Sequence, residues 1–181
     1  MDKLFWGFFF LVFHFNLNFN SATLSLLPDW VGYLLLYLGC SQLLRESELF
    51  QKPRPFCAGL GIYTGILWLI HLWGISVGPP VVGWILGLVV TCLRLYIAMR
   101  IVDAITNVEM RRNYDLCAAH LRKVWKVLAV CTAATYLLTL LSALALVCTV
   151  LLAVTGIAFL IAIHGTRKAW RAMLDEQSKP F

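Results

Sequence analysis

A few ionisable side chains inside apolar segments are the residues of this sequence whose type and position could support chemistry. Asp29 begins an uncharged run, His14 follows a Phe-rich stretch, and His71 lies within a third apolar segment. Ionisable groups in such segments can form an ion or proton path. Asp29, His14 and His71 are therefore the candidate polar or ion site. The competing interpretation of Asp29 is a helix-start carboxylate, which complements the positive end of the helix dipole.

Other chemistry has little support in the sequence. The four histidines lie in four different segments without an HxxxH pair, and the six cysteines are scattered without a CxxC pair. We therefore predict no metal site, no disulfide framework and no cofactor. GxSxG and HExxH motifs are absent, and so are the EExxxR pair of membrane proteases and the paired aspartates of lipid-headgroup transferases. The sequence thus favours a protein without catalytic residues.

The composition sets the class of protein. Hydrophobic residues make up 61% and charged residues 13% of the 181 residues, whereas soluble domains have about 45–50% and about 25%. We predict one integral membrane domain over residues 1–181, all-α, with the lipid bilayer as its main partner. The net charge of +6 could indicate nucleic acid in a soluble protein. Here the basic residues flank apolar runs and are interpreted as topology determinants, so nucleic acid is not expected as a partner.

The basic segment over residues 94–126 fixes the orientation. Seven of the 15 Lys and Arg residues lie in it, and a further group follows the last apolar run. Because basic residues are retained on the cytoplasmic side and contact lipid headgroups there, these positions are the predicted topology and headgroup residues: Arg94, Arg100, Arg111, Arg112, Arg122, Lys123, Lys126, Arg167 and Lys168.

Two uncharged runs are too long to be single spans. Residues 55–93 would form a helix of about 58 Å, nearly twice the ~30 Å hydrocarbon core, and residues 127–166 are as long. Each run must fold back on itself. The first is expected to turn at Gly78-Pro79-Pro80 and the second near Ser142.

These constraints give about six transmembrane helices with both termini inside the cell membrane. The predicted spans are residues 4–19, 29–45, 56–77, 81–99, 124–141 and 145–166. In this arrangement every Lys and Arg lies on one side, with Arg94 near an inner end where its stem can snorkel, and Asp29 is the only charge on the other side. Residues 100–123 become a cytoplasmic amphipathic link. We expect this link to be helical with a new start at Asn113, and to carry the pairs Arg100 with Asp103 and Arg111 with Asp115.

The first segment allows more than one interpretation. Polar and apolar residues alternate strictly after Phe13, which favours extended backbone over helix there. We therefore expect this span to be short or only partly inserted. A cleaved signal peptide ending near Ser21-Ala22 is the alternative.

GxxxG spacings predict where helices approach closely. Gly61/Gly65 and Gly83/Gly87 lie in the third and fourth predicted spans, and we expect them to pack these two spans. Self-association through the same glycines is the alternative.

The first part of the chain resembles a known group of proteins. A Phe-rich start, an alternating segment, LLPDWVGYLLLYLG and a charged loop follow one another over residues 3–54. This order is similar to that of small multi-spanning membrane proteins of Gram-positive bacteria, a group without an assigned reaction. The resemblance implies acidic or basic residues where this chain has His14, Asn16 and Asn18, so it weakens an ion-binding role for the alternating segment.

Two functions remain compatible with the sequence. The absence of a charged intramembrane site and the short loops favour a membrane-embedded interaction or accessory subunit, whose partner is another membrane protein or a second copy. The alternative is a small-solute or ion transporter or channel, which Asp29, His14, His71 and the asparagines near the outer half would serve.

Overall fold

The computed structural model describes residues 1–12, 16–19, 22–25, 28–73, 80–138 and 145–177. Six α-helices, one short 3₁₀ helix and two short strands follow one another. They are α1 (Asp2–Val12), β1 (Asn16–Phe19), β2 (Ala22–Ser25), α2 (Asp29–Leu43), η1 (Glu48–Gln51), α3 (Arg54–Leu72), α4 (Pro80–Arg112), α5 (Ala118–Leu138) and α6 (Ala145–Gln177).

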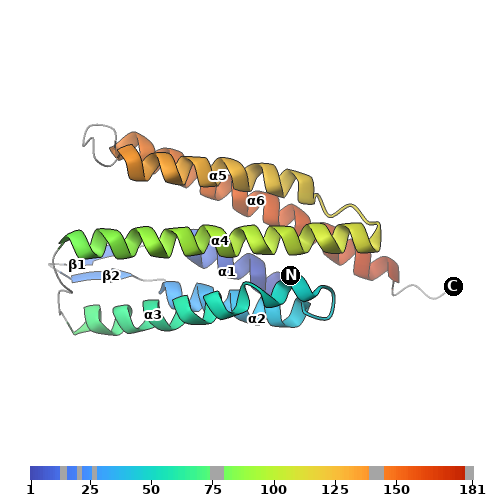
Figure 1. The fold of residues 1–181 in the computed structure, drawn as a ribbon, viewed down its shortest axis with the longest axis horizontal. Coiled ribbons are helices and arrows are strands. Elements are labelled where there is room, and N and C mark those ends of the chain that lie inside the picture. Colours follow the sequence, from blue (N-terminus) through green and yellow to red (C-terminus); the bar gives the residue numbers. More distant parts are fainter. Residues whose placement is uncertain (13–15, 20–21, 26–27, 74–79, 139–144, 178–181) are drawn as a thin grey trace.

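The helices lie roughly along one long axis, so the molecule has two distinct ends (Figure 1). The start of α1, the connection from α2 to α3 and the end of α6 lie at one end, which we call the basic end; β1, β2 and the start of α4 lie at the other, which we call the hairpin end. α1 packs on α2, α2 packs on α3, and α5 pairs with α6. α4 lies between these two groups and contacts α5 and η1.

The six helices correspond to the six predicted segments, and the predominantly helical prediction is confirmed. The first segment differs, because α1 ends at Val12 instead of continuing to residue 19. The alternating residues form extended backbone, as their pattern predicted: β1 and β2 pair antiparallel, with Asn16 opposite Ser25 and Phe19 opposite Ala22. This pairing satisfies ladder groups that a lone extended segment would leave without partners.

The fourth predicted span and the first half of the predicted link form one helix. α4 has 33 residues and is about 50 Å long. It continues past residue 99 because Ile101, Ile105 and Val108 are buried in the core. They belong to one apolar cluster with Phe50 of η1 and Leu121 of α5. The part of α4 predicted to lie along the headgroups therefore belongs to the packed core of the basic end.

Asn113 has a different role from the predicted one. Its φ of 49° is left-handed, a conformation that ends helices and that Asn tolerates, so Asn113 terminates α4 and does not start α5. The start of α5 is capped by Glu109 from the last turns of α4. Its Oε2 accepts hydrogen bonds from the N–H groups of Leu116 and Ala118, both at 2.9 Å.

Two helical stretches among the described residues are long and apolar enough to cross a membrane. They are Gly83–Arg112 within α4 and Val150–Glu176 within α6. The predicted turns at Gly78-Pro79 and near Ser142 lie outside the described residues. Pro80 is the first residue of α4, a position where its missing N–H costs nothing.

Glycines allow a close contact between α1 and α2. A Cβ at Gly32 would lie 3.1 Å from the Gly7 carbonyl oxygen, and one at Gly7 would lie 3.0 Å from the Gly32 carbonyl oxygen. Gly39 is equally crowded, since a Cβ there would lie 2.7 Å from a methyl carbon of Leu4. Side chains of Leu11 and Leu36 and the opposite backbone therefore leave no space for a Cβ at Gly7 or Gly32.

We expect Gly32→Ala to destabilise the protein by about 1–3 kcal/mol, because the added methyl group meets backbone that cannot move independently. Gly83→Ala is the matched control, since a Cβ at Gly83 has nothing within 4 Å and alanine in a helix is favoured over glycine by about 0.5–1 kcal/mol. Thermal unfolding in mild detergent compares the two variants. Equal melting temperatures would show that the α1–α2 contact is not tight.

Candidate functional site

The three candidate residues of the polar site are only partly placed. Asp29 is the first residue of α2 and is partly exposed. His71 lies in the last turn of α3, and the structure does not describe its side chain. His14 lies outside the described residues. The start of α2 and the end of α3 both point toward the hairpin end (Figure 1), so Asp29 and His71 share that end of the molecule.

Arg94 has a more central position than the sequence predicted. It lies about 21 Å along α4 from Pro80, near the middle of the helix and only partly exposed. Its Nη2 donates a hydrogen bond to the carbonyl oxygen of Leu11 in the last turn of α1. The last carbonyls of a helix have no partner within the helix and carry the negative end of its dipole. Arg94 therefore caps α1 from another helix.

Two groups of α2 lie close to this cap. Tyr33 is buried, and both Arg94 and Asp29 lie within electrostatic reach of its hydroxyl. The end of α1 and Arg94 are joined by a hydrogen bond, and the buried Tyr33 lies within electrostatic reach of Arg94; we call these three the Arg94 cluster. Sequence reasoning assigned Arg94 to topology and missed this cluster. The position of Arg94 in the sequence could have indicated its different role. It lies six residues before Arg100, which places it about 9 Å farther from the basic end.

The other basic residues gather at the basic end. Asp2 accepts hydrogen bonds from Arg167 and from Nη2 of Arg171, the latter at 2.8 Å to each carboxylate oxygen. Guanidinium groups of α6 thereby hold the start of α1. Burial acts in the opposite direction, but the hydrogen bond from Arg171, the largest cause, and that from Arg167 lower the pKa of the Asp2 carboxyl.

Further ion pairs join the remaining elements of the basic end. Arg112 pairs with Glu46 and Arg122 pairs with Asp103, both at 2.7 Å. Of the two predicted pairs within the link, Arg100 and Asp103 are found at 4.0 Å. Asp115 instead accepts a hydrogen bond from the Cys117 N–H. The side chains that remain exposed at or near this end include Arg111, Lys123, Lys126 and Lys168.

The two predicted glycine pairs differ in whether they lie against another helix. Gly61 and Gly65 approach α2: a Cβ at Gly61 would lie 3.5 Å from Tyr33 Cβ, and one at Gly65 would lie 3.7 Å from Trp30 Cβ. They do not pack against α4. Gly83 faces open space, and the carbonyl oxygen of Gly87 accepts a hydrogen bond from Thr91. The contacting glycines that the prediction missed are Gly7, Gly32 and Gly39, whose spacings do not match GxxxG.

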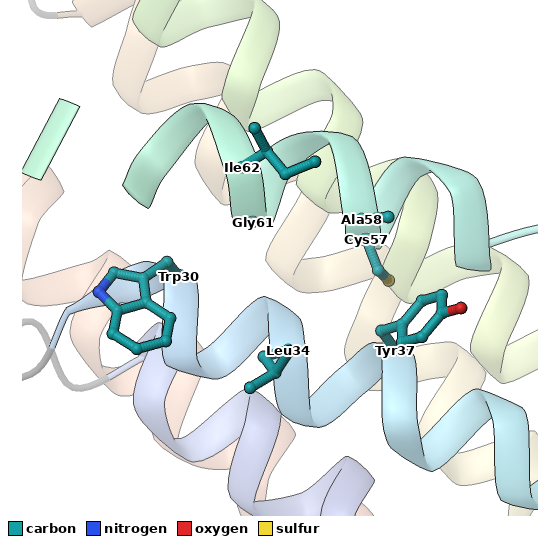
Figure 2. Close-up of a pocket in the computed structure, with 7 residues that line it drawn as sticks. All are labelled: Trp30, Leu34, Tyr37, Cys57, Ala58, Gly61 and Ile62. Carbon is teal, nitrogen blue, oxygen red and sulfur yellow. The ribbon is translucent and has the colours of Figure 1, made fainter. Parts of the chain in front are cut away.

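An apolar groove of about 310 Å³ runs between α2 and α3. Figure 2 shows Trp30, Leu34 and Tyr37 on α2, and Cys57, Ala58, Gly61 and Ile62 on α3. The small residues Ala58 and Gly61 leave the space, and the larger side chains border it.

The described residues include no group of three or more His, Cys, Asp or Glu side chains placed to hold a metal ion. Cys40, Cys57, Cys92, Cys117 and Cys131 are free thiols. Comparison of the chain with protein-family models, with curated proteins and with solved structures finds no match.

The hydrogen bonds from Arg167 and Arg171 to Asp2, which we call the Asp2 clamp, make the stability of the protein depend on pH. Because the pKa of Asp2 is lower in the folded protein than in the unfolded chain, the clamp contributes its full stability above about pH 4 and loses it as the pH falls through the folded-state value. We expect Asp2→Asn to remove this part of the pH dependence. Melting temperatures between pH 7 and pH 3 measure it, and Glu48→Gln at an exposed carboxylate of η1 is the control. An unchanged profile in Asp2→Asn would contradict the clamp.

The Arg94 cap predicts a specific loss of stability. Arg94→Ala leaves the Leu11 carbonyl without its donor among apolar side chains, which costs about 1–3 kcal/mol. Arg111→Ala, at an exposed arginine on the same helix, should change stability by less than about 0.5 kcal/mol. Thermal unfolding in the same detergent measures both variants. If the two substitutions had equal effects, the cap would not contribute to stability.

Proposed function

We propose that this chain is a multi-spanning protein of the cell membrane, with six spans and both termini inside, and that it acts as a membrane-embedded interaction or accessory subunit. Three features support this proposal: the apolar surface of the helices, the difference in charge between the two ends, and the divergence of α5 and α6 from α4.

The apolar surface supports the membrane part of the proposal. Large apolar side chains are exposed along several helices; examples are Ile62 at 66%, Trp73 at 82%, Val130 at 68% and Ile161 at 67%. Monomeric soluble proteins rarely expose contiguous apolar surface of this kind. In a bilayer, the lipid tails would cover these side chains at no cost.

The charges support the orientation. In the described residues, the ion pairs involving Asp2, Glu46 and Asp103 all gather toward the basic end. Asp29 is the one acidic residue that the described helices carry at the hairpin end. Since basic residues favour the cytoplasmic side, the basic end would lie in the cytoplasm. α4 and α6 are longer than the ~30 Å hydrocarbon core, so their ends would form a packed cytoplasmic base.

The separation of α5 from α4 is the observation that carries the subunit proposal. Near the basic end the two helices are joined, because Trp125 Nε1 donates to the Leu95 carbonyl oxygen at 3.3 Å and Arg122 pairs with Asp103. Toward the hairpin end the α5–α6 pair diverges from α4 (Figure 1). Beyond the joined region, both helices expose apolar side chains such as Val89 and Val130. A helix of another membrane protein could pack against the apolar surfaces of α4 and α5 toward the hairpin end.

Transport is the second candidate function, and the Arg94 cluster favours it. Charged residues within membrane spans often mark ion or proton paths, and Arg94 lies near Tyr33 within the bundle. Its cap on α1 is a sufficient structural reason for the charge, so we place this candidate second.

Cysteine labelling tests the topology. In a variant whose native cysteines are replaced by serine or alanine, Trp73→Cys at the end of α3 should react with a membrane-impermeant maleimide on intact cells. Met110→Cys, in the last turn of α4 and 70% exposed, should react only after permeabilisation. Labelling of both positions on intact cells would contradict the six-span orientation.

Affinity purification from native membranes in mild detergent, with mass spectrometry of associated proteins, separates the two functions. The subunit proposal predicts a stoichiometric membrane partner, whose binding is weakened by Val130→Arg on the exposed face of α5 and retained in Lys123→Gln. If the protein is instead monodisperse and without a partner, we expect it to support solute flux in liposomes, and Arg94→Ala should abolish this flux. Asp29→Asn should leave insertion and folding intact.

A further inference from the structure

The groove between α2 and α3 ends beside an arginine that has no acidic partner among the described residues. Arg54 is the first residue of α3. Its guanidinium lies over the Tyr37 ring, 5.0 Å from the ring centroid, and its Nη2 donates to the Tyr37 hydroxyl at 3.1 Å. Tyr37 also lines the groove. The ring thus joins the apolar groove to a positive charge at the basic end.

The donors of Arg54 are only partly used. Its Nε is buried and makes no hydrogen bond to any described residue, and no described carboxylate lies within ion-pair distance of its guanidinium. A buried donor of a charged group without a partner is costly. A second unpaired donor lies on Arg100, whose Nε is likewise buried. Arg54 as a whole is only partly buried, so an anion can reach the outer nitrogens of its guanidinium but not the buried Nε.

The position of Arg54 in its helix points in the same direction. The N-terminus of a helix carries partial positive charge, so a cation in the first turn is disfavoured unless an anion lies nearby. α3 has 19 residues, so the peptide dipoles of several turns add up at its N-terminus. Arg100 adds further positive charge, because it stacks on Tyr96 and Tyr96 contacts Phe56 in the first turn of α3 at 5.1 Å.

The groove itself fits a hydrocarbon chain. Trp30 and Tyr37 lie at its two ends on α2. The helix rises about 10 Å between them, which is roughly two thirds of one leaflet of a ~30 Å core. Leu34 and Ile62 border the groove and are exposed. An apolar furrow with a cation at its cytoplasmic end matches an amphiphile that has one chain and one anionic headgroup, in the orientation of an inner-leaflet lipid.

The geometry points to a specific site for an anionic phospholipid, with an acyl chain in the α2–α3 groove and the headgroup phosphate on Arg54. This inference rests on the proposed membrane location of the chain. The phosphate oxygens accept hydrogen bonds from the free guanidinium donors, and the start of α3 adds its dipole. Arg54 then recognises the headgroup, while Leu34, Ile62 and the groove floor bind the chain.

Native mass spectrometry of the purified protein tests the site with phosphatidylglycerol and phosphatidylcholine of identical chains. We expect the wild-type protein to prefer phosphatidylglycerol about tenfold, equivalent to about 1.4 kcal/mol. Arg54→Gln should abolish this preference, whereas Arg45→Gln, at an exposed arginine after the end of α2, should retain it. Ala58→Phe should weaken binding of both lipids by filling the groove. Equal binding of the two lipids by wild type, or a preference that survives Arg54→Gln, overturns the site.

A second measurement does not depend on substitutions. Phosphatidylglycerol with a photoactivatable acyl chain should crosslink to residues of the groove such as Leu34 and Ile62. Crosslinks confined to other helices, or a second protein copy covering the groove, would overturn the proposal. Cysteine labelling separates the two proposals: if the orientation holds and the lipid preference is absent, the lipid site alone fails; if labelling contradicts six spans, the proposed topology fails first.

Discussion

The end of α1 inside the bundle is the constraint on which the rest of this structure depends. A helix that stops among apolar side chains leaves carbonyl groups that need a donor. Arg94 of α4 supplies it to Leu11, and this fixes how α4 lies against α1. The opposite end of α1 is held by arginines of α6 through Asp2. One short helix therefore positions both long helices of the chain.

The two ends of the molecule differ in how well they are packed. At the basic end, Phe50, Ile105, Leu121 and other buried side chains form an apolar cluster, and ion pairs join α4 to the α2–η1 connection and to α5. Each exposed ion pair contributes little alone, but together they surround this core. Toward the hairpin end the α5–α6 pair diverges from α4 (Figure 1). The function that we propose uses this difference, with a stable base and an open apolar surface for a partner.

Length and charge were sufficient to predict the helical segments. Two uncharged runs longer than a bilayer had to fold back, and six helices follow in the structure. Strict alternation after Phe13 likewise predicted extended backbone, which β1 provides. Charged residues after Arg100 suggested a helical link at the surface, separate from the predicted span over residues 81–99, whereas α4 is continuous to Arg112. Their apolar neighbours Ile101, Ile105 and Val108 are buried by η1 and α5, which come from other parts of the chain.

The sequence by itself determined the apolar class of the chain, the helical segments and the position of the charges, because these depend on residues close together in the chain. Only the tertiary structure decided which helices touch. The GxxxG spacing drew attention to Gly83, whereas the close contact is made by Gly7 and Gly32, and Arg54 gains its place beside Tyr37 across 17 residues. Such contacts depend on which helix faces meet in space, and spacing within one helix cannot specify its neighbour.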